Sequence, residues 1–302
     1  MILVVLLYAL FASVFTISKT ALAVTEPFFL IGSRMLVAGI ILVAYLLLIK
    51  KETIKINKQD WFQIILLAVL NIYMTNALEF WGLRYLTSFK TCFIYSLSPF
   101  ASALISYFVF TEKMNFKKWM GLAIGFSGFL PIFFHHTQIE EQAGTFWAFS
   151  WAELSVVGAA LTSVWGWIIL KQLVSHRNLS FILVNGLSMI IGGLIALFHS
   201  ALTETWEPLP VSDYAIFGLT AIALIIISNL ICYNLYGSLL RRFSATFMSF
   251  AGFTTPLFTA LFGWFFLGET IAPPFYLSAA IVFAGLTLFY HEELVLKQEV
   301  SI

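Results

Sequence analysis

Residues 97–128 read LSPFASALISYFVFTEKMNFKKWMGLAIGFSG, and residues 254–285 read TTPLFTALFGWFFLGETIAPPFYLSAAIVFAG. Pro99 and Glu112 are separated by the same interval as Pro256 and Glu269, and both stretches end on a glycine. Each stretch contains two apolar segments joined by a polar turn. An internal repeat of this length indicates a duplicated chain, and its apolar character points to a membrane protein.

The composition of the whole chain agrees with this interpretation. Of the 302 residues, 61% are hydrophobic and only 10% are charged, whereas about a quarter of the residues of a soluble domain are charged. The net charge of +1 gives no sign of nucleic acid as a partner, and the sequence has no basic run with the spacing that reads a nucleic-acid groove, so we expect no such partner. Cys92 and Cys232 both lie in apolar segments, where we expect buried core residues rather than a disulfide. The expected surroundings are a lipid bilayer.

We expect an all-α integral membrane protein, because helices satisfy their own backbone hydrogen bonds in lipid. The first segment runs to Lys19 and is interpreted as a transmembrane helix rather than a signal peptide, since no Lys or Arg precedes it. Nine further segments complete ten transmembrane helices: Pro27–Ile49, Phe62–Leu83, Phe89–Phe110, Trp119–Phe134, Trp147–Leu170, Ser180–His199, Tyr214–Gly237, Phe243–Leu267 and Phe275–Tyr290.

The positive charges predict the orientation, because cytoplasmic loops are enriched in Lys and Arg. One set of loops and the tail contain most of them: Lys50, Lys51, Lys55, Lys58, Lys113, Lys117, Lys118, Lys171, Arg177, Arg241, Arg242 and Lys297. We therefore expect both termini in the cytoplasm. The first and sixth helices then run in opposite directions. This predicts two inverted five-helix repeats at residues 1–134 and 147–290, with a cytoplasmic tail at 291–302. Inverted repeats favour alternating access to a site near the membrane midplane.

Several motifs carry a resemblance to a known family: Phe11-Ala12-Ser13 followed by Lys19, Ser33-Arg34-Met35-Leu36-Val37-Ala38-Gly39, Ser98-Pro99 with Glu112, Trp165-Gly166, Thr255-Pro256, and Leu267-Gly268-Glu269. In this order the motifs resemble the drug/metabolite transporter superfamily, and specifically its EamA-type ten-helix members. The resemblance implies a secondary transporter in a bacterial inner membrane, not an enzyme. It implies an amino acid or amino-acid derivative as substrate, with exchange of S-adenosylmethionine for S-adenosylhomocysteine as the alternative. A coupling proton or a counter-substrate is the expected second partner.

Ionisable residues inside the hydrocarbon layer are candidates for substrate binding. Arg34 is expected to bind a carboxylate and to neutralise Glu79 and Glu153, and Glu79 to bind an ammonium group or a proton. The alternative is a purely structural ion pair, with Lys19 and Lys90 extending to the membrane surface. Further polar and aromatic candidates for the substrate site are Asn76, Tyr95, Ser98, Trp165, Tyr233, Tyr236, Phe250 and Thr255.

Proline and small residues predict how the helices bend and pack. Pro99 and Pro256 are expected within helices at matching positions, as moving hinges or as static kinks. Small residues on one face of the fifth and tenth helices predict close helix packing: Gly121, Gly125, Gly128, Ala280 and Ala284.

Other chemistry has little support in the sequence. The two aspartates, Asp60 and Asp213, lie in separate loops, which disfavours a membrane enzyme acting on a lipid or isoprenoid. The chain contains no Gly-Lys dipeptide and therefore no P-loop. His135, His136, Glu140 and Glu141 match no metal-site spacing. We expect no catalytic residues, metal or cofactor. A membrane scaffold without transport activity remains the other alternative, although matched polar residues in both halves disfavour it.

Overall fold

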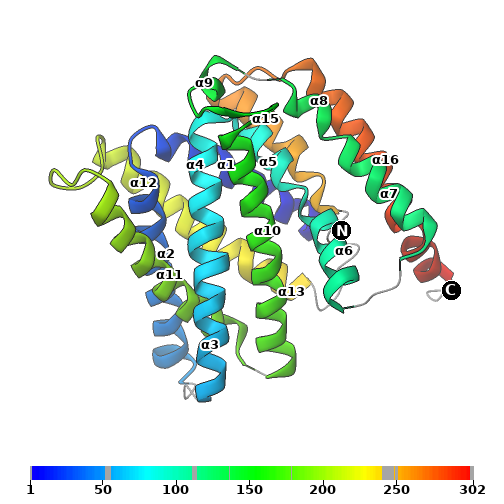
Figure 1. Ribbon diagram of the computed structural model, residues 1–302. Helices are drawn as coiled ribbons and strands as arrows, with labels where there is room; N and C mark the ends of the chain where they lie inside the picture. Colours follow the sequence, from blue (N-terminus) through cyan, green and yellow to red (C-terminus); the bar gives the residue numbers. More distant parts are fainter. Residues whose placement is uncertain are drawn as a thin grey trace.

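The computed structural model describes residues 2–51, 56–110, 114–135, 137–177, 179–239, 248 and 251–299, and this part of the chain is almost wholly helical (Figure 1). The first half contains α1 (Ile2–Leu22), α2 (Pro27–Ala44), η1 (Tyr45–Ile49), α3 (Lys58–Leu67), η2 (Ala68–Met74), α4 (Thr75–Tyr85), α5 (Ser88–Tyr95), α6 (Ser98–Phe110), α7 (Phe116–Ser127) and α8 (Leu130–Phe133). The connection contains α9 (Gln138–Glu141) and the antiparallel strands β1 (Thr145–Phe146) and β2 (Phe149–Ser150). The second half contains α10 (Trp151–Lys171), η3 (Gln172–His176), α11 (Phe181–Thr203), α12 (Tyr214–Leu224), η4 (Ile225–Cys232), α13 (Tyr233–Leu239), α15 (Thr255–Leu267) and α16 (Pro273–Glu299).

Among the described residues, seven helices are long and apolar enough to cross a membrane. Their lengths and composition confirm the predicted all-α membrane architecture. The three other expected crossings occur as shorter pieces. The expected helix at 89–110 is divided into α5 and α6, and the one at 119–134 into α7 and α8. Within the expected helix at 243–267, the structure describes residue 248 and residues 251–267, and the latter include α15.

The breaks at Pro99 and Pro256 have the same cause in both halves. Proline has no amide hydrogen, so the carbonyl four residues earlier loses its helical partner. The Ser98 hydroxyl donates to the freed Tyr95 carbonyl at 2.7 Å, and the Thr255 hydroxyl donates to the Gly252 carbonyl at 2.7 Å. The expectation that these prolines lie in the middle of helices is therefore corrected. Each proline lies in the first turn of a new helix, α6 or α15.

The repeat is also visible in the positions of the helices. At the offset that relates Pro99 to Pro256, α6 coincides with α15, and both have 13 residues. The same offset relates the π-helical segments η2 and η4 and the first residues of α7 and α16. Helices at matching positions also pack against each other, α2 with α11 and α7 with α16.

Glycines allow these paired helices to approach closely. A Cβ atom at Gly39 would lie 2.7 Å from the Gly186 carbonyl oxygen, and one at Gly121 would lie 2.8 Å from the Gly285 carbonyl oxygen. The predicted close packing of small residues is thus confirmed for α7 and α16. It also occurs between α2 and α11.

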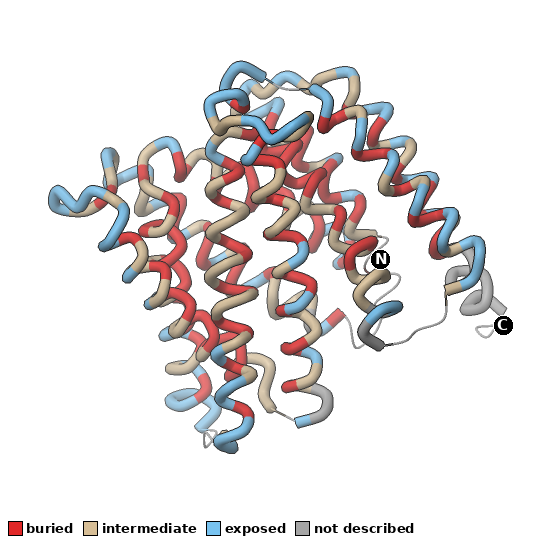
Figure 2. The backbone as a smooth tube through the Cα atoms, viewed as in Figure 1, coloured by how far each residue is buried: buried red, intermediate tan, exposed pale blue. Residues whose placement is uncertain are grey.

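The two ends of the bundle differ. We call the end that holds α9 and the β1–β2 turn the hairpin end, and the end where α3 begins the opposite end (Figure 1). Figure 2 shows that buried positions concentrate where helices face one another. Large apolar side chains such as Phe62, Phe198 and Phe265 point outward and are well exposed, as expected for a surface in contact with lipid.

Candidate functional site

Arg34 is a buried cation with incomplete hydrogen bonding. Its side chain, on α2, is 2% exposed. Its Nη2 donates to the Asn76 side-chain oxygen at 2.5 Å, and its guanidinium lies 4.8 Å from the centre of the Phe80 ring. Within the described part of the chain, its Nε and Nη1 atoms have no hydrogen-bond partner. Such donors can bind an anionic group, because an uncompensated charge in this environment is costly.

Glu79 lies one helical turn after Asn76 on α4 and is partly accessible. It is close enough to Arg34 and Tyr95 to interact with them electrostatically. No hydrogen bond or ion pair joins its carboxylate to another described residue, in contrast to Glu153. The guanidinium and the carboxylate thus provide complementary charges at one level of the bundle, although they are not paired directly. This arrangement suits a zwitterion.

An aromatic cluster adjoins these charges. Tyr233 lies near Arg34, and its ring stacks on Trp167 with a centroid distance of 5.7 Å and an angle of 26°. Trp167 also lies 5.3 Å from Tyr236, whose other neighbour is Phe11 on α1 at 6.4 Å. All these rings except Phe11 come from α10 and α13. The predicted Tyr233 therefore lies near Arg34, and the predicted Tyr236 belongs to the same aromatic cluster.

Trp167, rather than the predicted Trp165, belongs to this cluster. Trp165 is 39% exposed and has no ring contact with the tyrosines among the described residues. The sequence contains a signal that favours Trp167, because the buried Ala160, Ser163 and Val164 precede it by seven, four and three residues. These intervals place them on one face of a helix.

The remaining predicted residues have separate surroundings. Tyr95 is partly accessible, lies near Glu79 and Tyr233, and has its ring 6.3 Å from that of Phe15. Ser98 and Thr255 use their hydroxyl hydrogens at the helix breaks and so do not offer them to a ligand. Phe250 lies outside the described residues.

Glu153 does not pair with Arg34, contrary to the expectation from sequence. Its carboxylate lies 2.7 Å from the Lys90 ammonium, which lies equally close to Glu140. Lys90 also donates to the His135 carbonyl oxygen at 2.8 Å. This buried triad joins α5 to α9 and α10, so Lys90 does not extend to the membrane surface. Glu153 additionally forms a capping box with Ser150 at the start of α10.

Two further ionic groups complete helix ends at the hairpin end. Lys19 donates to three backbone carbonyls at the end of α4, at distances from 2.6 to 3.1 Å: Leu83, Arg84 and Leu86. Glu269 accepts from the amide and the hydroxyl of Ser88, at 2.8 and 2.6 Å, where α5 begins. The glutamate of the second repeat therefore stabilises a helix of the first. Its counterpart, Glu112, lies outside the described residues.

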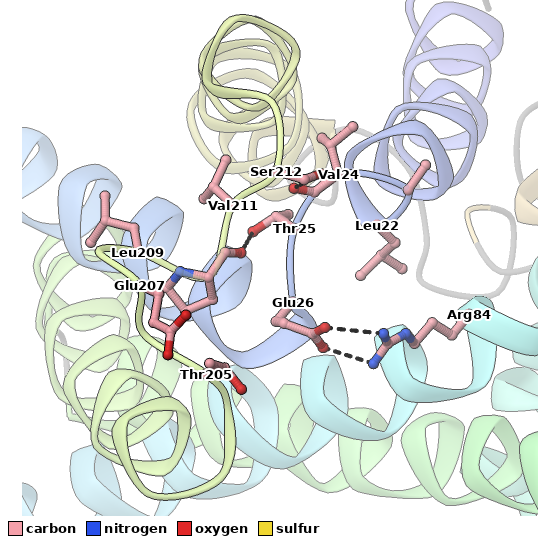
Figure 3. A pocket seen from close by; sticks show the side chains of 12 residues that line it. Leu22, Val24, Thr25, Glu26, Arg84, Thr205, Glu207, Leu209, Val211 and Ser212 are labelled. Carbon is pink, nitrogen blue, oxygen red and sulfur yellow. Dashed lines mark hydrogen bonds and ion pairs between the residues drawn. The ribbon is translucent and has the colours of Figure 1, made fainter.

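A pocket of about 320 Å³ opens at the hairpin end, between the turn at 22–26 and the loop at 205–212 (Figure 3). The carboxylate of Glu26 pairs with the Arg84 guanidinium on one side of this pocket, at 2.8 Å, and Glu207 lies on the other side. The two loops are joined by the hydrogen bond from Thr25 to the Pro210 carbonyl oxygen at 2.9 Å. No group of three His, Cys, Asp or Glu side chains within the described ranges is arranged to hold a metal ion.

Comparison with known proteins gives a consistent result. Residues 1–134 and 150–291 match the sequence model of a family described as the "EamA-like transporter family". An "S-adenosylmethionine/S-adenosylhomocysteine transporter" of Chlamydia muridarum is 41% identical, over 94% of this chain and 89% of that protein. The protein with the same description from Chlamydia trachomatis serovar D is 40% identical, over 94% and 86%. A solved structure with 14% identity has a TM-score of 0.65 and covers 96% of this chain and 95% of its own, which shows a shared fold.

Proposed function

The chain belongs to the EamA-like transporter family, and we propose that it exchanges S-adenosylmethionine for S-adenosylhomocysteine across a bacterial inner membrane. The chain is a multi-pass membrane protein of a transporter family. The observation that carries the substrate is the 40–41% identity, over 94% of the chain, to chlamydial transporters described by these two compounds. This similarity favours the adenosylated compound over the simple amino acid that the sequence motifs also suggested.

The chemistry of the site supports the proposal. Both compounds carry a carboxylate and an ammonium group on one carbon atom. The Nε and Nη1 donors of Arg34, which have no partner among the described residues, suit the carboxylate, and the nearby Glu79 suits the ammonium. Hydrogen bonds to charged groups are among the stronger ones in proteins, which favours tight orientation of the amino-acid part.

The orientation is part of the same proposal. We place both termini in the cytoplasm, because the loops of the opposite end contain most of the Lys and Arg residues. The pocket beside Glu26 and Arg84 then opens to the outside. The two repeats, 1–134 and 147–290, move relative to each other during transport. The breaks at Pro99 and Pro256 act as the hinges about which α6 and α15 move.

Counterflow in proteoliposomes tests the proposal. Vesicles loaded with S-adenosylhomocysteine are expected to take up radiolabelled S-adenosylmethionine transiently without a pH gradient, and unloaded vesicles far less. Methionine and other amino acids are expected to drive little uptake. Strong uptake of amino acids without uptake of S-adenosylmethionine would show that the proposed substrate is wrong. Uptake that requires a pH gradient would show that transport is coupled to protons rather than to exchange. No flux from correctly folded protein would favour the scaffold alternative.

A further inference from the structure

The ring of Trp167 occupies a position that neither the sequence motifs nor the relatives' descriptions assign to a ligand. It is partly accessible, although it lies in the interior-facing stripe of α10. Tyr233 covers one side of it at a nearly parallel angle, and Tyr236 lies against it at 49°. Side chains packed in this way have fixed orientations, so an accessible part of the cluster presents a rigid flat surface. Rigid aromatic surfaces bind planar rings by stacking.

Contacts along the continuous helix formed by α3, η2 and α4 relate the level of Gly166, the neighbour of Trp167 in the chain, to the level of Arg34. Gly166, next to Trp167, packs directly on Asn71, where a Cβ atom at Gly166 would lie 2.4 Å from the Asn71 Cβ atom. Arg34 is bonded to Asn76, five residues further along that helix. Five residues of helix correspond to about 7 Å along the axis.

A ligand that reaches both sites must therefore carry an anionic group and a flat ring separated by a flexible link of similar or somewhat greater length. In an adenosyl amino acid, the carboxylate and the purine are roughly 10 Å apart when the link is extended, given bond lengths near 1.5 Å. We propose that Trp167, supported by Tyr233 and Tyr236, is the purine-binding residue of the substrate site. The inference rests on the proposed substrate and specifies how the site recognises it.

The same cluster accounts for acceptance of two substrates that differ in charge. S-adenosylmethionine has a positive sulfonium, whereas S-adenosylhomocysteine has a neutral thioether. Aromatic faces attract cations, and they also make favourable contacts with neutral sulfur. A carboxylate beside the sulfur atom would instead favour the charged form strongly. An aromatic surface between the charged pair and the purine position thus permits both partners of the exchange.

Ligand affinities of purified variants test this inference. Trp167→Ala and Trp167→Phe are compared with wild type and with Trp165→Ala, a matched control two residues away on an exposed face. The ligands are S-adenosylmethionine, S-adenosylhomocysteine, adenosine and methionine. Stacking on an aromatic side chain is typically worth about a tenfold change in affinity or more. Trp167→Ala is expected to lose roughly tenfold or more for the three adenosyl ligands, with methionine unchanged, and Trp167→Phe to lose less.

The outcomes separate the two proposals. If wild type binds neither sulfur compound, the proposed function is wrong and the purine site with it. If wild type binds and exchanges both, but Trp167→Ala keeps its affinity for adenosine or loses affinity for methionine equally, the purine site alone is wrong. If Trp167→Ala does not fold, Trp167→Leu, which keeps an apolar side chain without an aromatic ring, replaces it, and unchanged adenosine affinity in this variant would overturn the assignment.

Discussion

Arg34 and Asn76 are joined by a hydrogen bond of 2.5 Å between α2 and α4. The Asn76 amide nitrogen donates to the carbonyl oxygen of Ile72 at 2.8 Å and to that of Asn71 at 3.3 Å. These two bonds direct the amide oxygen towards Arg34. The oxygen is uncharged, so it orients the guanidinium without neutralising it, and the positive charge remains available for a ligand.

Changing Asn76 is therefore expected to alter carboxylate binding in two ways. Asn76→Asp places a negative charge beside the Arg34 guanidinium, where it competes with the carboxylate of the ligand. The variant should weaken S-adenosylhomocysteine binding by roughly 10- to 100-fold, the range for a hydrogen-bonded charged group. Asn76→Leu removes only the orientation and should have a smaller effect. Isothermal titration measures both, with adenosine as the ligand that lacks a carboxylate. Equal losses for adenosine would contradict this role.

Glu79→Gln is expected to remove recognition of the amino group. The substitution preserves shape but removes the negative charge, so wild type should prefer S-adenosylhomocysteine over its deaminated analogue by about tenfold or more, and the variant should not. The affinity ratio of the two ligands is the relevant measurement, because it cancels general damage to the site. An unchanged ratio would show that Glu79 does not contact the ammonium.

Some of these features follow from local sequence and others do not. The sequence predicts a disturbance at Pro99 and Pro256, because proline acts on the carbonyl four residues earlier in any helix, but it does not predict that a new helix begins there. The choice between Trp165 and Trp167 depends on direction, since two residues turn a helix by about 200°. The partners of Lys90 depend on the distant Glu140 and Glu153, and nothing in the local sequence specifies which of several acidic residues approaches it.

Lys90→Met is expected to destabilise the protein strongly. Lys90 and its partners Glu140 and Glu153 are at most 4% exposed, so the variant leaves two buried carboxylates without their cation. Removing one partner of a buried pair typically costs about 3–5 kcal/mol. Arg84→Met breaks the exposed pair with Glu26 and should cost about 1 kcal/mol or less. Thermal unfolding in detergent compares the two variants, and similar melting temperatures would contradict a stabilising triad.

Gly39→Ala is expected to destabilise the contact between α2 and α11. The new Cβ atom would lie 2.7 Å from the Gly186 carbonyl oxygen and 2.8 Å from the Ile190 backbone nitrogen, so the helices must separate. Overpacking of this kind costs about 1–3 kcal/mol. Gly218→Ala is the matched control, because a Cβ atom there meets nothing within 4 Å. It should leave the melting temperature equal or higher, and a comparable loss in both variants would refute the packing explanation.

The exchange itself is expected to move charge. S-adenosylmethionine carries one more positive charge than S-adenosylhomocysteine, and the proposed site binds both with the same two charged residues, Arg34 and Glu79. Each one-for-one exchange therefore transfers one charge across the membrane, worth about 2.3 kcal/mol per 100 mV. In proteoliposomes with a potassium diffusion potential of 100 mV, negative inside, the inside-to-outside ratio of S-adenosylmethionine divided by that of S-adenosylhomocysteine should rise about 50-fold over its value at zero potential. Homoexchange of S-adenosylmethionine is the control, because it moves no net charge. If the exchange of S-adenosylmethionine for S-adenosylhomocysteine does not depend on the membrane potential, another ion must be transported to compensate the charge. Glu79 would then be the first residue to test for binding that ion.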